Sequence, residues 1–161
     1  MAVAKILWVD DEIESLQSQK LFLEHKGYEV HTLTNGFDAI EYVKDHVVDV
    51  VLMDETMPGI TGLETLARIK EVNGQIPVVL ITKNETENLM DDAIGSQITD
   101  YLIKPVNPNQ VLLSLKKIID NKRLVAEKTT NTYQQHFRYL FMALRNKPDD
   151  KTCIVIYKKS I

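Results

Sequence analysis

The chain has 161 residues, of which 44% are hydrophobic and 26% are charged, a composition typical of a soluble globular protein with a proper core. Its only cysteine, Cys153, excludes a disulfide framework and suggests a reducing compartment, so we expect a cytoplasmic protein. The first apolar run, from Ile6 to Val9, is too short for a signal peptide or a membrane span and is stopped by Asp10.

The charge is distributed unevenly along the chain. Residues 1–121 contain 10 Lys or Arg against 20 Asp or Glu, whereas residues 122–161 contain 9 against 3. This asymmetry predicts a domain at 1–121, a helical extension or linker at 122–147 and a C-terminal tail at 148–161. The acidic balance of the first part argues against direct nucleic-acid binding, and no membrane partner is expected.

Short apolar runs alternate with segments of helical period over the first 121 residues. The predicted strands are Lys5 to Val9, Glu29 to Leu33, Val48 to Met53, Pro77 to Ile81 and Asp100 to Ile103. The predicted helices are Ser15 to His25, Gly36 to Lys44, Gly62 to Val72, Glu85 to Ile94 and Pro108 to Ile119. Asn107 is placed to cap the last helix. This alternation predicts an α/β fold, a doubly wound parallel sheet with helices on both faces.

Polar side chains stand where the predicted strands end. Asp10 and Asp11 follow the first strand, Asp54 the third, Thr82 the fourth and Lys104 the fifth. Ligand sites in such folds lie at the carboxyl ends of the strands. If the sheet order brings these strands together, three carboxylates, a hydroxyl and an ammonium meet in one crevice.

Carboxylates gathered in one crevice repel one another unless a cation neutralises them. A few hard oxygen ligands favour Mg²⁺, which keeps several of its waters. Asp54 would be both a metal ligand and a nucleophile that attacks a phosphoryl group. Lys104 and Thr82 would hold the phosphoryl oxygens.

Four segments resemble the receiver domains of two-component response regulators. They are KILWVDDE at 5–12, VVLMDETMPGITGLE at 50–64, PVVLITK at 77–83 and DYLIKP at 100–105. The resemblance, which covers residues 4 to about 121, implies a (βα)5 flavodoxin-like sheet of strand order 2-1-3-4-5. It also implies a phosphoacceptor signalling domain and not an enzyme.

The resemblance assigns roles to individual positions. It implies that Asp54 accepts phosphate from a sensor histidine kinase, and that Asp11 binds Mg²⁺ directly. Asp10, through water or directly, and the backbone carbonyl of Thr56 would complete the metal site. It further implies that Thr82 and Tyr101 form a switch pair, that Lys104 binds the phosphate, and that the bond before Pro105 is cis.

Other residues at or near the strand ends have no assigned role in metal binding or phosphoryl transfer. Lys83, after the switch threonine, departs from the small residue usual in this family, and we expect it to alter the lifetime of phosphorylated Asp54. Glu12 and Glu55 are expected to be surface acids, and Trp8 a core residue.

The C-terminal part has its own apolar pattern. It comprises a stripe at helical spacing, formed by Tyr133, Phe137, Leu140, Phe141 and Leu144, and an unpaired strand at Thr152 to Tyr157. We therefore expect a partner, for which one candidate is a homodimer through the fourth helix and fifth strand or through the C-terminal helices.

Three functions remain open from the residues. The first is a phosphate-dependent switch, and the second is a constitutive interaction or dimerisation module. The third is the regulatory part of a larger alkaline-phosphatase-like enzyme, because the chain also resembles the start of PorX-like regulators.

Overall fold

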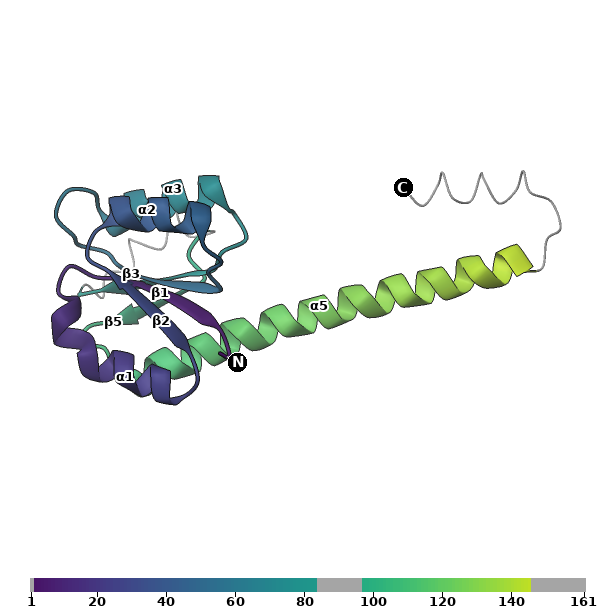
Figure 1. Cartoon of the computed structure of the whole chain (residues 1–161), viewed down its shortest axis with the longest axis horizontal. Coiled ribbons are helices and arrows are strands. Elements are labelled where there is room, and N and C mark those ends of the chain that lie inside the picture. Colours follow the sequence, from purple (N-terminus) through teal and green to yellow (C-terminus); the bar gives the residue numbers. More distant parts are fainter. Residues whose placement is uncertain (1, 84–96, 146–161) are drawn as a thin grey trace. The chain divides into compact units, whose positions relative to one another are not determined.

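The computed structural model of the chain describes residues 2–83 and 97–145. Its strands are β1 (Lys5–Val9), β2 (Glu29–Leu33), β3 (Val50–Asp54), β4 (Val78–Thr82) and β5 (Asp100–Ile103). They form one parallel sheet of order β2-β1-β3-β4-β5, which confirms the predicted fold and strand order (Figure 1). β3 and β4 each end one residue later than predicted, so Asp54 and Thr82 are the last residues of their strands.

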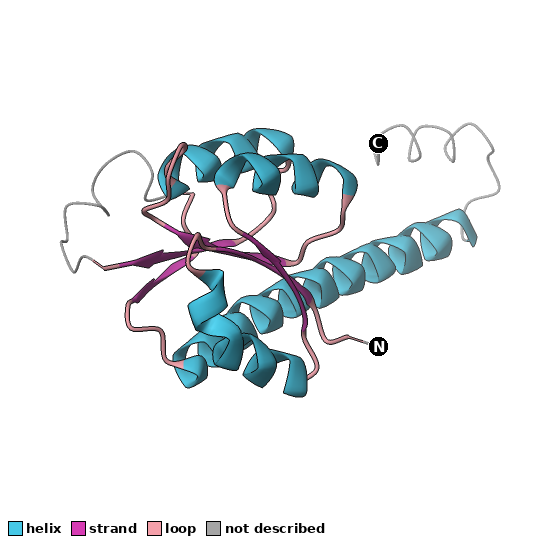
Figure 2. Ribbon diagram, turned by 60° about the vertical axis from the view of Figure 1, so that its left-hand side comes forward, coloured by secondary structure: helices cyan, strands magenta, loops and turns pink. Residues whose placement is uncertain are grey.

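Helices lie on both faces of the sheet. They are α1 (Gln17–His25), preceded by the 3-10 turn η1 (Ile13–Leu16), then α2 (Gly36–Asp45), α3 (Gly62–Val72) and α5 (Pro108–Arg145). α1 and the first turns of α5 cover one face, and α2 and α3 cover the other (Figure 2). The predicted helix at 85–94 and the predicted strand at 152–157 lie outside the described residues.

The core follows the two-residue period of the strands. Ile6 and Trp8 of β1 point to the face covered by α1 and α5, whereas Leu7 and Val9 point to the face covered by α2 and α3. All of β3 and β4 is buried, as expected for parallel strands with helices on both sides. Trp8 is fully buried, as predicted, and its indole Nε1 has no hydrogen-bond partner among residues 2–83 and 97–145.

The start of α3 packs tightly on the end of β3. Thr61 and Glu64 form a reciprocal capping box, in which the Glu64 N–H donates to Thr61 Oγ1 at 3.2 Å. Gly62 follows the cap, and a Cβ at this position would lie 2.1 Å from the carbonyl oxygen of Asp54. Only glycine allows this approach, so Gly62 fixes how close α3 comes to the end of β3.

Helix α5 joins two segments that were predicted separately. Asn107 caps it as expected, since its Oδ1 accepts a hydrogen bond from the Asn109 N–H at 2.9 Å. The helix predicted at Pro108 to Ile119 continues without a break into the helical extension predicted at 122–147, as far as Arg145, because no Pro or Gly interrupts residues 109–145. The chain divides into two compact units at this point, Met1–Ile119 and Asp120–Ile161.

The part of α5 beyond Ile119 exposes apolar side chains. Phe137, a member of the predicted stripe, is 70% exposed, and Leu124 and Val125 are also exposed. No helix in the described part of the chain is both long and apolar enough to cross a membrane.

Candidate metal centre

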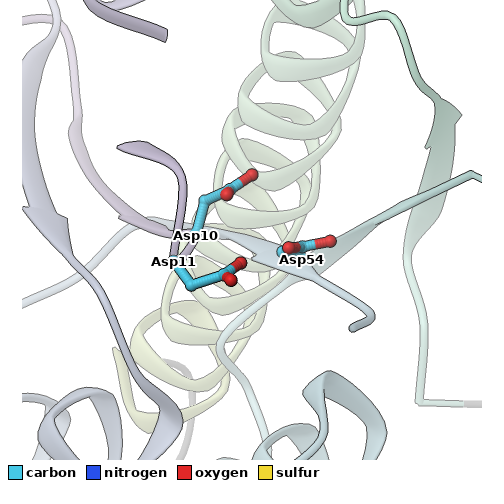
Figure 3. Close-up of side chains that lie close together, drawn as sticks. All are labelled: Asp10, Asp11 and Asp54. Atoms are coloured by element: carbon cyan, nitrogen blue, oxygen red, sulfur yellow. The ribbon is translucent and has the colours of Figure 1, made fainter. Parts of the chain in front are cut away.

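Three aspartates from two strand ends meet at the carboxyl edge of the sheet. Asp10 and Asp11 follow β1, and Asp54 ends β3. One carboxylate oxygen from each lies within 4.8 Å of the others (Figure 3). Asp10 is fully buried and Asp54 is 4% exposed, whereas Asp11 is open to solvent. The predicted convergence of the three carboxylates is therefore present.

Backbone contacts hold Asp10 in place. Its N–H donates to the carbonyl of Leu33 at 3.0 Å, which ties the residue to the end of β2. Its Oδ1 accepts from the Glu12 N–H at 2.8 Å. The second carboxylate oxygen, Oδ2, faces the ammonium of Lys104.

Lys104 bridges two of the aspartates. Its Nζ lies 3.1 Å from Asp10 Oδ2 and 3.2 Å from Asp54 Oδ1, and only 15% of its side chain is exposed. Its backbone N–H donates to the carbonyl of Thr82 at 2.8 Å, which sets the lysine beside the end of β4. The Lys104–Pro105 peptide bond is cis, as the resemblance implied.

The pKa values show that the crevice is short of positive charge. Burial, and next the negative charge of Asp10, raise the pKa of Asp54 from 3.8 to about 6, although Lys104 opposes the shift. Burial acts to lower the pKa of Lys104, but Asp10 and Asp54 outweigh it, so this pKa lies above its ordinary value. One buried ammonium therefore does not fully compensate the carboxylates.

The donor set fits a magnesium ion. Two oxygens on one Mg²⁺ stand at most about 4.2 Å apart, because each bond is about 2.1 Å long. The observed carboxylate oxygens, within 4.8 Å of one another, need only a small adjustment to reach this spacing. Asp11 is exposed, which leaves room for the waters that Mg²⁺ retains.

Thr82 lies next to this crevice, but its hydroxyl contacts a residue that was expected to be a surface acid. Thr82 Oγ1 donates a hydrogen bond to Glu55 Oε2. Glu55 is half-buried, so the expectation of a plain surface acid was wrong for it, whereas Glu12 is exposed as expected. The strand register explains the contact: Asp54 pairs with Ile81, so Glu55, directly after β3, comes close to Thr82, the last residue of β4.

The remaining predicted site residues lie around the rim. Thr56 follows in the loop after β3, and its N–H donates to Asp54 Oδ1 at 3.4 Å. Tyr101 of β5 is 43% exposed, so its side chain lies at the surface and not in the core. Lys83, directly after β4, is exposed.

Comparison with known proteins gives one consistent match. The model of the family described as "Response regulator receiver domain" matches residues 6–116. The transcriptional regulatory protein ZraR of Klebsiella oxytoca is 36% identical over 132 residues, which is 82% of this chain and 30% of that protein. The chain thus spans less than a third of the length of this curated relative.

Solved structures of the same kind share the fold. Response regulator protein TrrA from Thermotoga maritima, solved in complex with Mg²⁺–BeF, has a TM-score of 0.65 and 29% identity, covering 72% of this chain and 99% of that one. A CheY-like receiver domain protein from Methanospirillum hungatei has a TM-score of 0.70 over 76% of this chain and 98% of its own, at 24% identity.

Proposed function

The chain belongs to the family of response regulator receiver domains, and from this premise we propose that Asp54 is its phosphoacceptor in a Mg²⁺-dependent reaction with a sensor histidine kinase. Receiver domains accept a phosphoryl group on an aspartate from histidine kinases. The observation that carries the proposal is the grouping of Asp54 with Asp10, Asp11 and Lys104 at one edge of the sheet.

The side chains supply distinct parts of this chemistry. The Asp54 carboxylate forms a bond to phosphorus while the bond from phosphorus to the donor nitrogen breaks and its electron pair leaves with the donor. Mg²⁺ held by Asp10, Asp11, Asp54 and the carbonyl of Thr56 would neutralise the charge of the transferred group. The Lys104 ammonium would form an ion pair with a phosphoryl oxygen, since it already lies 3.2 Å from Asp54 Oδ1.

Phosphorylation then changes the surface through Thr82 and Tyr101. The Thr82 hydroxyl donates a hydrogen bond to a phosphoryl oxygen, and Tyr101, which is 43% exposed, turns inward behind it. A nearly complete change of state requires about 5.5 kcal/mol of differential binding between the two conformations. The exposed position of the Tyr101 side chain is the one expected for the unphosphorylated state.

The output involves more than the receiver domain. We assign residues 1–121 to the receiver, 122–147 to a helical extension and 148–161 to a tail, and the division of the chain between Ile119 and Asp120 supports the first boundary. The exposed Phe137 on α5 favours homodimerisation through the C-terminal helix, and the region of residues 85–94 and β5 is the alternative surface that we propose. The reducing cytoplasm, where a single cysteine is stable, is the proposed location.

Phosphoryl transfer is tested with a small phosphodonor. Intact-protein mass spectrometry after incubation with acetyl phosphate and Mg²⁺ should show one added phosphoryl group on the wild-type protein. Asp54→Asn and excess EDTA should each abolish it. Asp45→Asn, which changes an exposed acid in α2, is the matched control and should be phosphorylated normally. A phosphorylated Asp54→Asn protein would contradict the assignment.

The alternative is a constitutive dimerisation module, which the exposed Phe137 also favours. Sedimentation in Mg²⁺, with and without beryllofluoride as a phosphoryl mimic, separates the two functions. A mass change that requires Asp54 supports the switch. A constant dimer mass under all conditions supports the constitutive module.

A further inference from the structure

Glu55 is held firmly by its backbone on both sides. Its N–H donates to the carbonyl of Ile81 at 2.8 Å, and its carbonyl accepts from the Gly62 N–H at 2.8 Å. These bonds fix the residue between the end of β4 and the start of α3. With the backbone held in this way, the Glu55 carboxylate accepts a hydrogen bond from the Thr82 hydroxyl.

The Thr82 hydroxyl carries a single proton. In this structure it donates that proton to Glu55 Oε2, an acceptor with negative charge. A hydrogen bond from Thr82 to a phosphoryl oxygen on Asp54 would use the same proton. The two bonds exclude each other, because one hydroxyl proton cannot serve two strong acceptors at once.

We propose that Glu55 is a positioning residue that latches Thr82 in the resting state, so that phosphorylation must compete with the Glu55 carboxylate for the Thr82 hydroxyl. This inference rests on the proposed function of Asp54. Glu55 directly follows the phosphoacceptor in sequence, and its carboxylate contacts Thr82, the last residue of β4. Its carboxylate also places a further negative charge beside the arriving phosphoryl group.

The latch sets how readily the activated conformation forms. Thr82 is 3% exposed, so its hydrogen bond to Glu55 is largely shielded from water. Breaking its bond to Glu55 therefore carries a cost, while the half-buried Glu55 carboxylate regains water. Loss of the latch should tighten the binding of a phosphoryl mimic about three- to tenfold, as expected for one charge-assisted hydrogen bond that is partly exposed.

The test is calorimetric titration of beryllofluoride into the full chain at saturating Mg²⁺. Glu55→Ala should bind beryllofluoride more tightly than the wild-type protein. Glu55→Asp keeps the charge but withdraws the carboxylate from Thr82, and it should show most of the same gain. A gain in Glu55→Ala that is absent in Glu55→Asp would assign the effect to charge and overturn the latch.

Two controls separate the hydrogen bond from other causes. Glu12→Gln removes one negative charge from an exposed acid at the same edge and measures the effect of charge alone. In a Thr82→Val background there is no hydroxyl to latch, so Glu55→Asp should have no effect there. Equal effects of Glu55→Asp with and without the Thr82 hydroxyl would overturn the proposal.

The outcomes also distinguish this inference from the proposed function. If the wild-type protein binds no beryllofluoride and Asp54 takes up no phosphoryl group, both fail. If the wild-type protein does both, but Glu55→Ala binds beryllofluoride no more tightly than Glu12→Gln, only the latch fails.

Discussion

Lys104 Nζ lies 3.2 Å from Asp54 Oδ1, and the same ammonium pairs with Asp10 at 3.1 Å. Two of the three carboxylates that form the candidate metal centre are therefore already paired with a cation of the chain itself. An incoming Mg²⁺ and the Lys104 ammonium therefore compete for the same two carboxylates, until a phosphoryl group supplies new oxygens for the lysine.

This competition predicts opposite effects of Lys104→Met on two steps. Mg²⁺ should bind about three- to tenfold more tightly, since the carboxylates lose their internal counter-charge. Phosphorylation by acetyl phosphate should become slower, because the ammonium no longer holds the phosphoryl oxygen. Calorimetry with Mg²⁺ and a time course of phosphorylation measure the two steps.

A surface lysine provides the control for this variant. Lys44 pairs with Glu41 on α2, so Lys44→Met should leave both Mg²⁺ affinity and phosphorylation rate unchanged. Weaker Mg²⁺ binding in Lys104→Met would contradict the competition.

The raised pKa of Asp54 predicts a pH-dependent stability in the absence of metal. Its pKa is about 6 in the fold against an ordinary value of 3.8, so the folded state binds more protons between these values. The free energy of unfolding should therefore fall as the pH rises from about 4 to about 6 and stay low above that range.

Asp54→Asn removes this titration and should be the more stable protein at pH 7. The gain should be about 1–3 kcal/mol, from about 1.4 kcal/mol per unit of pKa shift. Urea denaturation in EDTA across this pH range measures it, and adding Mg²⁺ should stabilise the wild-type protein more than the variant. Parallel pH profiles of the two proteins would show that Asp54 is not the group responsible.

Lys83 follows the end of β4 and is exposed, so it is placed to approach a phosphoryl group without belonging to the buried ion pairs. Its positive charge should hold the phosphoryl oxygens and screen them from water. Lys83→Ala should therefore shorten the lifetime of phosphorylated Asp54 severalfold, as followed by mass spectrometry after removal of the phosphodonor. Lys26→Ala, in which a lysine over the Phe22 ring is lost, serves as the control. An unchanged dephosphorylation rate in Lys83→Ala rules out this role.

Gly62→Ala should damage both stability and the acidic site. The added Cβ would lie 2.1 Å from the Asp54 carbonyl oxygen, so α3 or the end of β3 has to shift. The expected cost is about 1–3 kcal/mol or more in the free energy of unfolding, together with weaker Mg²⁺ binding. In Gly74→Ala the new Cβ would meet only the Lys70 carbonyl, at an ordinary 3.5 Å, so this control should behave like the wild-type protein.

The sheet and its acidic edge could be predicted because short stretches of the sequence indicate where each strand lies and where it ends. Apolar runs such as Val50 to Met53 mark strands that are buried on both faces, and a polar residue directly after such a run must lie at the strand end. Asp54 and Lys104 were therefore found from their positions, and the resemblance added the order of the strands.

Two features of the structure could not be predicted from local sequence. The helix at Pro108 to Ile119 and the helical extension at 122–147 were predicted as separate segments, but no helix breaker lies between them, so α5 is one helix as far as Arg145. The contact between Glu55 and Thr82 depends on the register of β3 against β4. Because β3 and β4 are buried on both faces, their sequences are continuous apolar runs without the alternation that would indicate the register.

The buried Trp8 gives the chain an intrinsic optical reporter. It is the only tryptophan, it is fully buried two residues before Asp10, and its indole N–H has no partner within the described ranges 2–83 and 97–145. Its fluorescence comes from one known position beneath the acidic edge of the sheet. Changes in emission on addition of Mg²⁺ or beryllofluoride can therefore be followed in real time, without a label, in the unmodified protein.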